Sequence, residues 1–89
     1  MSPQDFLLRL SVPNHPEGVN VVVAIARHAV TYAAIEPAKG AAFVDRARAA
    51  AAVTLKGGTP SHCAVTCAAG EGQLTLTVGG QTVSEPLPA

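Results

Sequence analysis

The clearest helical pattern in the chain runs from residue 37 to residue 55, PAKGAAFVDRARAAAAVTL. Small and apolar residues recur there at the spacing that places side chains on one face of an α-helix. This face consists of Phe43, Ala47, Ala50, Ala51, Thr54 and Leu55. Pro37 suits a first helical turn, and Gly57-Gly58 ends the helix. Because alanine lets another element approach closely, we expect this helix to lie flat on a sheet.

Strands are predicted on both sides of the helical part of the chain. Residues 6–12 alternate, with Phe6, Leu8, Leu10 and Val12 on one side. Residues 63–68 and 73–78 also alternate, and the glycine-containing turn at 69–72 joins them as a β-hairpin. Two rows of the hairpin would face the helices, namely Cys63, Val65 and Cys67, and Leu74, Leu76 and Val78.

A further helix is predicted between the first strand and residue 33. Its apolar stripe consists of Val19, Val22, Val23, Ala26, Ala29, Val30 and Ala33. Asn14 or His15 leads into this helix, with Pro16 near its first position. The predicted order is therefore β-α-α-β-β, an α+β fold in which two helices cover one face of a small, mainly antiparallel sheet.

The chain is expected to form one domain, residues 1–89, with an ordered core over about residues 5–84. Gly79-Gly80 breaks the last strand, and residues 81–84 extend the sheet briefly. Pro86 and Pro88 predict a frayed C-terminal tail.

Charge and hydropathy narrow the classes of partner. Six Lys and Arg residues balance six Asp and Glu residues, so no electrostatic attraction to nucleic acid is expected. No apolar run is long enough to span a bilayer, and the N-terminus lacks the apolar core of a signal peptide. We therefore expect a cytoplasmic protein that binds neither nucleic acid nor membrane.

Neither cysteine chemistry nor metal binding is predicted. Cys63 and Cys67 lie four positions apart, about 13 Å along a strand, which is too far for a disulfide. The neighbouring His62 completes no zinc-ligand spacing. The two cysteines are therefore expected to be reduced, buried and slow to react. Asp45 and Arg48 are expected to form an ion pair on the helix surface.

The predicted order of elements and three phrases of the sequence resemble the serine-kinase anti-sigma factors, of the histidine-kinase-like ATPase superfamily. The phrases are FLLRLSVPNHPEGVNVVVAIARHAV, RAAAAVTL and AVTCAAGEGQLTLTVGG. The resemblance covers roughly residues 6–80 and implies a bacterial regulator with an ATP site on its second helix. It rests on pattern and spacing, and no invariant motif of the family is present.

The resemblance places the family's ATP-site positions on residues that lack the required chemistry. The general base falls on Ala51, and the magnesium-binding asparagine falls on Leu55. The aspartate that would bind adenine falls on Gly80, and the glycine after it falls on Thr82. Neither alanine nor leucine activates a hydroxyl or ligates magnesium through oxygen. The resemblance therefore implies a shortened relative with no catalytic residues, no metal site and no cofactor.

Three hypotheses about function follow. The first is a non-catalytic regulatory module, not an enzyme, that acts through protein contacts with a sigma factor or another regulator. The second is a small-molecule or nucleotide binder with a residual pocket under the 37–55 helix. The third is a small homo-oligomeric scaffold protein.

We also expect a homodimer, because a short open sheet leaves unpaired edges. The contact could lie on the edge of residues 73–78, where lysine at Thr75 and Thr77 would block it. The alternatives are the edge of residues 6–12 and the valine-rich face of the first helix.

Overall fold

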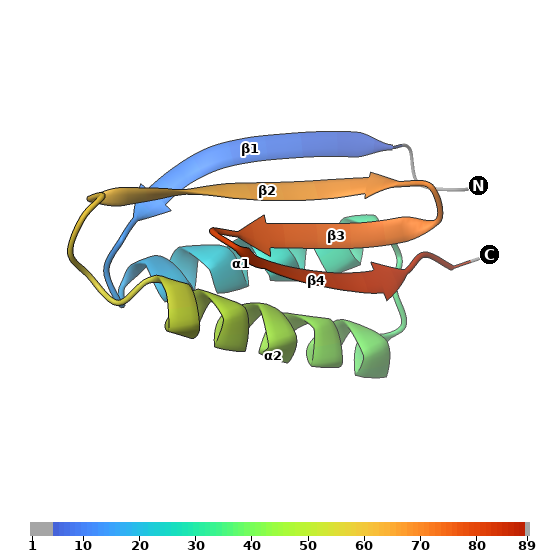
Figure 1. The fold of residues 1–89 in the computed structure, drawn as a ribbon. Coiled ribbons are helices and arrows are strands. Elements are labelled where there is room, and N and C mark those ends of the chain that lie inside the picture. The colour runs from blue at the N-terminus through green and yellow to red at the C-terminus, as the bar shows by residue number, and fades with distance from the viewer. Residues whose placement is uncertain (1–4, 89) are drawn as a thin grey trace.

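In the computed structural model, which describes residues 5–88, two helices cover one face of a four-stranded sheet (Figure 1). The elements are β1 Phe6–Pro13, α1 Gly18–Tyr32, α2 Pro37–Thr54, β2 His62–Gly70, β3 Gln73–Val78 and β4 Gln81–Pro86. The strands lie in the order β1-β2-β3-β4, and every neighbouring pair is antiparallel. The predicted α+β class, with both helices on one face of an antiparallel sheet, is confirmed.

The predicted face of α2 is the face that the sheet covers. Phe43, Ala47, Ala51 and Leu55 are all at most 1% exposed, and Ala50 is buried beside them. The helix lies against β3 and β4. Arg46 of α2 also forms a 2.8 Å ion pair with Glu85 of β4. The alanines thus let α2 approach the sheet closely, as expected from their size.

Helix α1 packs beside α2 and lies under the other half of the sheet (Figure 1). A Cβ on Gly40 of α2 would lie 3.4 Å from the Val30 side chain of α1, so this glycine permits the close helix contact. Helix α1 begins at Gly18, two residues later than Pro16. The side chain of Asn14 does not cap the helix; it bonds instead to the loop between α2 and β2.

The hairpin faces are also confirmed. Val65, Cys67, Leu74, Leu76 and Val78 are each at most 1% exposed and face the helices. They form the core together with the buried faces of the two helices.

The last strand is longer than predicted. Gly79-Gly80 does not end the sheet but forms the two-residue turn between paired residues Val78 and Gln81. Strand β4 continues to Pro86, and the Leu87 amide donates a hydrogen bond to the Gly72 carbonyl at 2.8 Å.

This strand corrects the expected position of one sheet edge. Residues 73–78 lie between β2 and β4, so Thr75 and Thr77 are not on an edge. Lysine substitution there would not test edge pairing. The two outer strands are β1 and β4.

Candidate functional site

The ATP-site positions implied by the resemblance lie at one end of the molecule. Ala51 is fully buried against the sheet, and Leu55, one helical turn later, is 1% exposed. Gly80 is exposed in the β3–β4 turn. That turn touches the end of α2, because a Cβ on the adjacent Gly79 would meet the Thr54 side chain. The three positions are thus held near one another, but two of them are filled by apolar core.

Among residues 5–88, no three His, Cys, Asp or Glu side chains lie close enough together to bind a metal ion. Cys63 and Cys67 are free thiols, the first half-buried and the second buried. Burial raises the pKa of the Cys67 thiol to about 11. In the same described range, no helix is long and apolar enough to cross a membrane.

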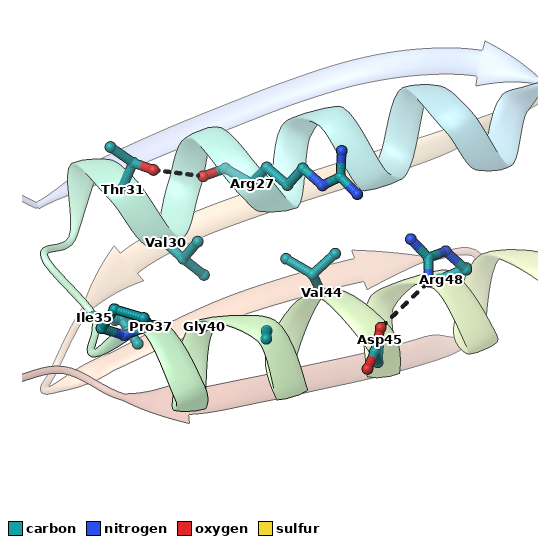
Figure 2. Close-up of a pocket in the computed structure, with 10 residues that line it drawn as sticks. Arg27, Val30, Thr31, Ile35, Pro37, Gly40, Val44, Asp45 and Arg48 are labelled. Atoms are coloured by element: carbon teal, nitrogen blue, oxygen red, sulfur yellow. Dashed lines mark hydrogen bonds and ion pairs between the residues drawn. The ribbon is translucent and has the colours of Figure 1, made fainter.

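A groove of about 500 Å³ lies between the two helices, and we call it the interhelical groove (Figure 2). Arg27 of α1 and Arg48 of α2 both line it, and Figure 2 shows Arg27 running along its own helix. Arg48 also pairs with Asp45 at 3.3 Å, which confirms the predicted ion pair. Two arginines and one aspartate leave a single formal positive charge in this groove.

A second groove, of about 590 Å³, lies between strand β1 and helix α1, and we call it the β1–α1 groove. Its lining is almost entirely apolar and consists of Phe6, Leu7, Leu8, Val21, Ala24, Ile25, His28, Ala29, Tyr32 and Cys67. Neither groove is lined by Ala51, Leu55 or Gly80. The positions that the resemblance assigns to an ATP site therefore contribute to neither of these two grooves.

The β1–α1 groove concentrates the exposed apolar side chains of the molecule. Five large hydrophobic residues are exposed among those described, and four of them line this groove: Leu7 at 60%, Leu8 at 44%, Val21 at 39% and Tyr32 at 53%. The Phe6 and Tyr32 rings meet edge to face, with centroids 5.1 Å apart. Such clustering of apolar groups is a feature of interaction surfaces, whereas single exposed apolar residues are ordinary.

The groove lies where an outer strand meets a helix whose lining side chains include two alanines. Ala24 and Ala29 line the groove from α1 and reach only a short way toward the sheet. Leu8 belongs to the predicted inward row of β1, yet it remains 44% exposed. The sequence prediction missed this site. The signals were the apolar pair Leu7-Leu8 and Val21, which lies outside the predicted stripe of α1.

No protein-family model, curated protein or solved structure matches the chain. The resemblance to anti-sigma factors therefore rests on the predicted order of elements and the sequence phrases alone.

Proposed function

We propose that this protein is a cytoplasmic, non-catalytic interaction module that acts by binding another protein surface in the β1–α1 groove. The single observation that carries the proposal is the clustering of four of the five described exposed large hydrophobic residues in that groove. Covering them with a protein partner would remove apolar surface from water, which is the main driving force of protein association.

Two further observations favour a protein over a small ligand. The groove is bordered by β1, an outer strand whose backbone groups on one side have no partner strand among residues 5–88. A protein partner can form hydrogen bonds with these N–H and C=O groups by adding a strand to the sheet. The groove also offers few polar groups to orient a small molecule, with His28 as its one titratable imidazole.

The resemblance to anti-sigma factors fits this proposal, and in that lineage the chain would retain protein contacts without nucleotide chemistry. Ala51 and Leu55 lie in the packed core, where a nucleotide site would need polar groups and space. A sigma factor or another regulator is then the class of partner that the lineage suggests.

A second candidate function is binding of a small anion in the interhelical groove. Arg27 and Arg48 approach it from different helices, and guanidinium groups bind carboxylate and phosphate well. The Asp45 carboxylate offsets part of this charge. Titration calorimetry with inorganic phosphate, for the unmodified chain and for Arg27→Gln, decides whether this groove binds anions.

Photo-crosslinking in the host cell tests the main proposal. A photoreactive phenylalanine analogue replaces Leu8 or Val21 in the β1–α1 groove, and in a matched control it replaces Val53. Val53 is also apolar and 57% exposed, but it lies on α2 outside both grooves. We expect discrete protein crosslinks from positions 8 and 21 and far fewer from position 53. Equal yields from all three positions would contradict the proposal.

A further inference from the structure

We infer that the occupant of the β1–α1 groove is a second copy of this chain, joined through antiparallel pairing of β1 with β1 centred on Leu7. This inference rests on the proposed function, because it identifies the protein that the groove binds. Pairing two identical outer strands around a two-fold axis would make one continuous sheet and would bring the two grooves together.

The side-chain rows of β1 restrict the register. Residues 6, 8, 10 and 12 belong to the helix-facing row, since Val12 is buried in the core and Phe6 and Leu10 pack against it. Leu7 and Arg9 alternate with them and lie on the other face. In an antiparallel pair, opposite residues project to the same face. Registers that place an even residue opposite an odd one would therefore put the helices of the two copies on opposite faces and separate the grooves.

Charge selects one of the remaining registers. With Leu7 opposite Leu7, Asp5 lies opposite Arg9 of the second copy, and the two-fold axis repeats this pair. Asp5 and Arg9 form no ion pair among residues 5–88, so both charges are available for the contact. Centring on Arg9 would instead oppose two arginines, and centring on Leu8 would oppose Arg9 and Leu7. Opposite charges directly across a strand pair stabilise it, and like charges destabilise it.

The same register places apolar groups together on the helix-facing side. Phe6 then lies opposite Leu8 of the second copy, beside the edge-to-face pair of Phe6 and Tyr32. The two copies of α1 lie on the same side of the joined sheet, so the exposed Val21 and Tyr32 of each groove turn toward the other copy. The contact thus covers Leu8, Val21 and Tyr32 on the helix-facing side, Leu7 on the opposite face, and the free backbone edge.

Sedimentation equilibrium of the full chain, over about 1–100 µM, tests the register by charge reversal. Arg9→Asp and Asp5→Arg each create two like-charge pairs and should weaken the dimer roughly 10-fold or more. The double variant Asp5→Arg/Arg9→Asp restores opposite charges and should restore the dimer. Lys39→Asp is the matched control, because Lys39 is exposed on α2 and the change in net charge is the same as for Arg9→Asp.

A disulfide measurement provides an independent test if a charge variant folds poorly. In the proposed register, the Leu7→Cys variant forms a disulfide-linked dimer on oxidation, because the Cβ atoms of directly opposite residues in a strand pair lie about 4.5–5.5 Å apart. Arg9→Cys, opposite Asp5, should give little covalent dimer under the same oxidant, and the unmodified chain controls for Cys63 and Cys67.

A monomer at all concentrations would overturn the inference, as would a dimer that charge reversal weakens no more than Lys39→Asp does. The chain could be monomeric while positions in the groove crosslink to a different protein. That result would refute this inference and leave the proposed function standing. An absence of groove crosslinks would refute the proposed function as well.

Discussion

Thr54 and Gly79 are in close contact where the end of α2 meets the β3–β4 turn. A Cβ on Gly79 would lie 2.6 Å from Thr54 Cγ2, and the Gly79 φ angle is +58°. The Thr54 hydroxyl also donates a hydrogen bond to the Val78 carbonyl at 3.4 Å. The turn that starts β4 therefore depends on a glycine both for its backbone conformation and for its packing on the helix.

Gly79→Ala should lower the free energy of unfolding by about 2–3 kcal/mol, because it adds left-handed backbone strain to a steric clash. Gly80→Ala is the matched control, since a Cβ there meets nothing within 4 Å. It should change stability by less than about 0.5 kcal/mol. Urea denaturation followed by circular dichroism measures both values.

A second-site change separates the clash from the strain. Thr54→Ser keeps the hydroxyl and removes Cγ2, so it should recover part of the stability that Gly79→Ala loses. If the double variant Gly79→Ala/Thr54→Ser is no more stable than Gly79→Ala, the contact with Thr54 contributes nothing.

Asn14 joins the β1–α1 turn to the loop between α2 and β2. Its side-chain amide donates to the Pro60 carbonyl at 2.7 Å, and its Oδ1 accepts from the Gly57 amide at 3.3 Å. Asn14→Ala removes both bonds and should cost about 1–2 kcal/mol of unfolding free energy. Asn20→Ala makes the same chemical change on the exposed surface of α1. We expect it to be neutral or slightly stabilising, because alanine favours helix. Equal losses in the two variants would contradict this role of Asn14.

The residues of α2, the hairpin and the loops show which parts of this fold the sequence predicts. Periodicity predicted the buried face of α2 and both rows of the hairpin, because burial repeats with the geometry of each element. It placed the break at Gly79-Gly80 correctly but made the following strand too short, because Pro86 suggested a frayed tail where β4 still pairs with β3. It placed Asn14 or His15 at the start of the first helix but did not find the bond from Asn14 to Pro60, because Pro60 is 46 residues away and only the fold brings them together.

The β1–α1 groove was missed for a related reason. Alternation showed which side of β1 faces the helices but not how far α1 extends beneath that strand. Leu8 lies on the inward row and is still 44% exposed, because β1 is an outer strand beside an open groove. The solvent exposure of the helix-facing residues of a strand depends on the element packed against them. A local sequence pattern carries no information about that element.

Cys67 should react with thiol reagents far more slowly than an ordinary cysteine. Burial raises the pKa of its thiol from 9.0 to about 11, so near pH 8 its thiolate fraction is roughly 100-fold lower. Because no Lys or Arg separates Cys63 from Cys67, labelling is best measured by mass spectrometry in the variants Cys63→Ser and Cys67→Ser. We expect faster native labelling of Cys63, which is half-buried, and equal labelling in urea. Rapid native labelling of Cys67 would show that its face is open.

The same thiol makes stability depend on pH. The unfolded chain loses the Cys67 proton near pH 9.0, whereas the folded chain keeps it until about pH 11. The stability gained by the neutral thiol is therefore fully present below pH 9 and is lost as the pH rises from 9 toward 11. The melting temperature of the unmodified chain should fall more steeply in this range than that of Cys67→Ala. Parallel slopes would exclude this contribution.

Introducing the ATP-site residues of anti-sigma factors at the matching positions should damage the fold rather than create a nucleotide site. Ala51→Glu places a carboxylate at a position with no exposure, and Leu55→Asn replaces a 1% exposed leucine by a shorter amide. Each should cost several kcal/mol, about 2–5 for the leucine, because an apolar core gives the new polar group no partner. Ala52→Glu is the matched control, since the neighbouring Ala52 is exposed on the same helix. It should stay within about 0.5 kcal/mol of the unmodified chain.

In titration calorimetry with ATP and magnesium, we expect no binding heat from the unmodified chain or from any of these variants. Binding of ATP by the unmodified chain in the submillimolar range would contradict the proposal of an interaction module without nucleotide chemistry. Binding by a folded Ala51→Glu/Leu55→Asn variant would contradict the expectation that an apolar core excludes a nucleotide site at the end of α2.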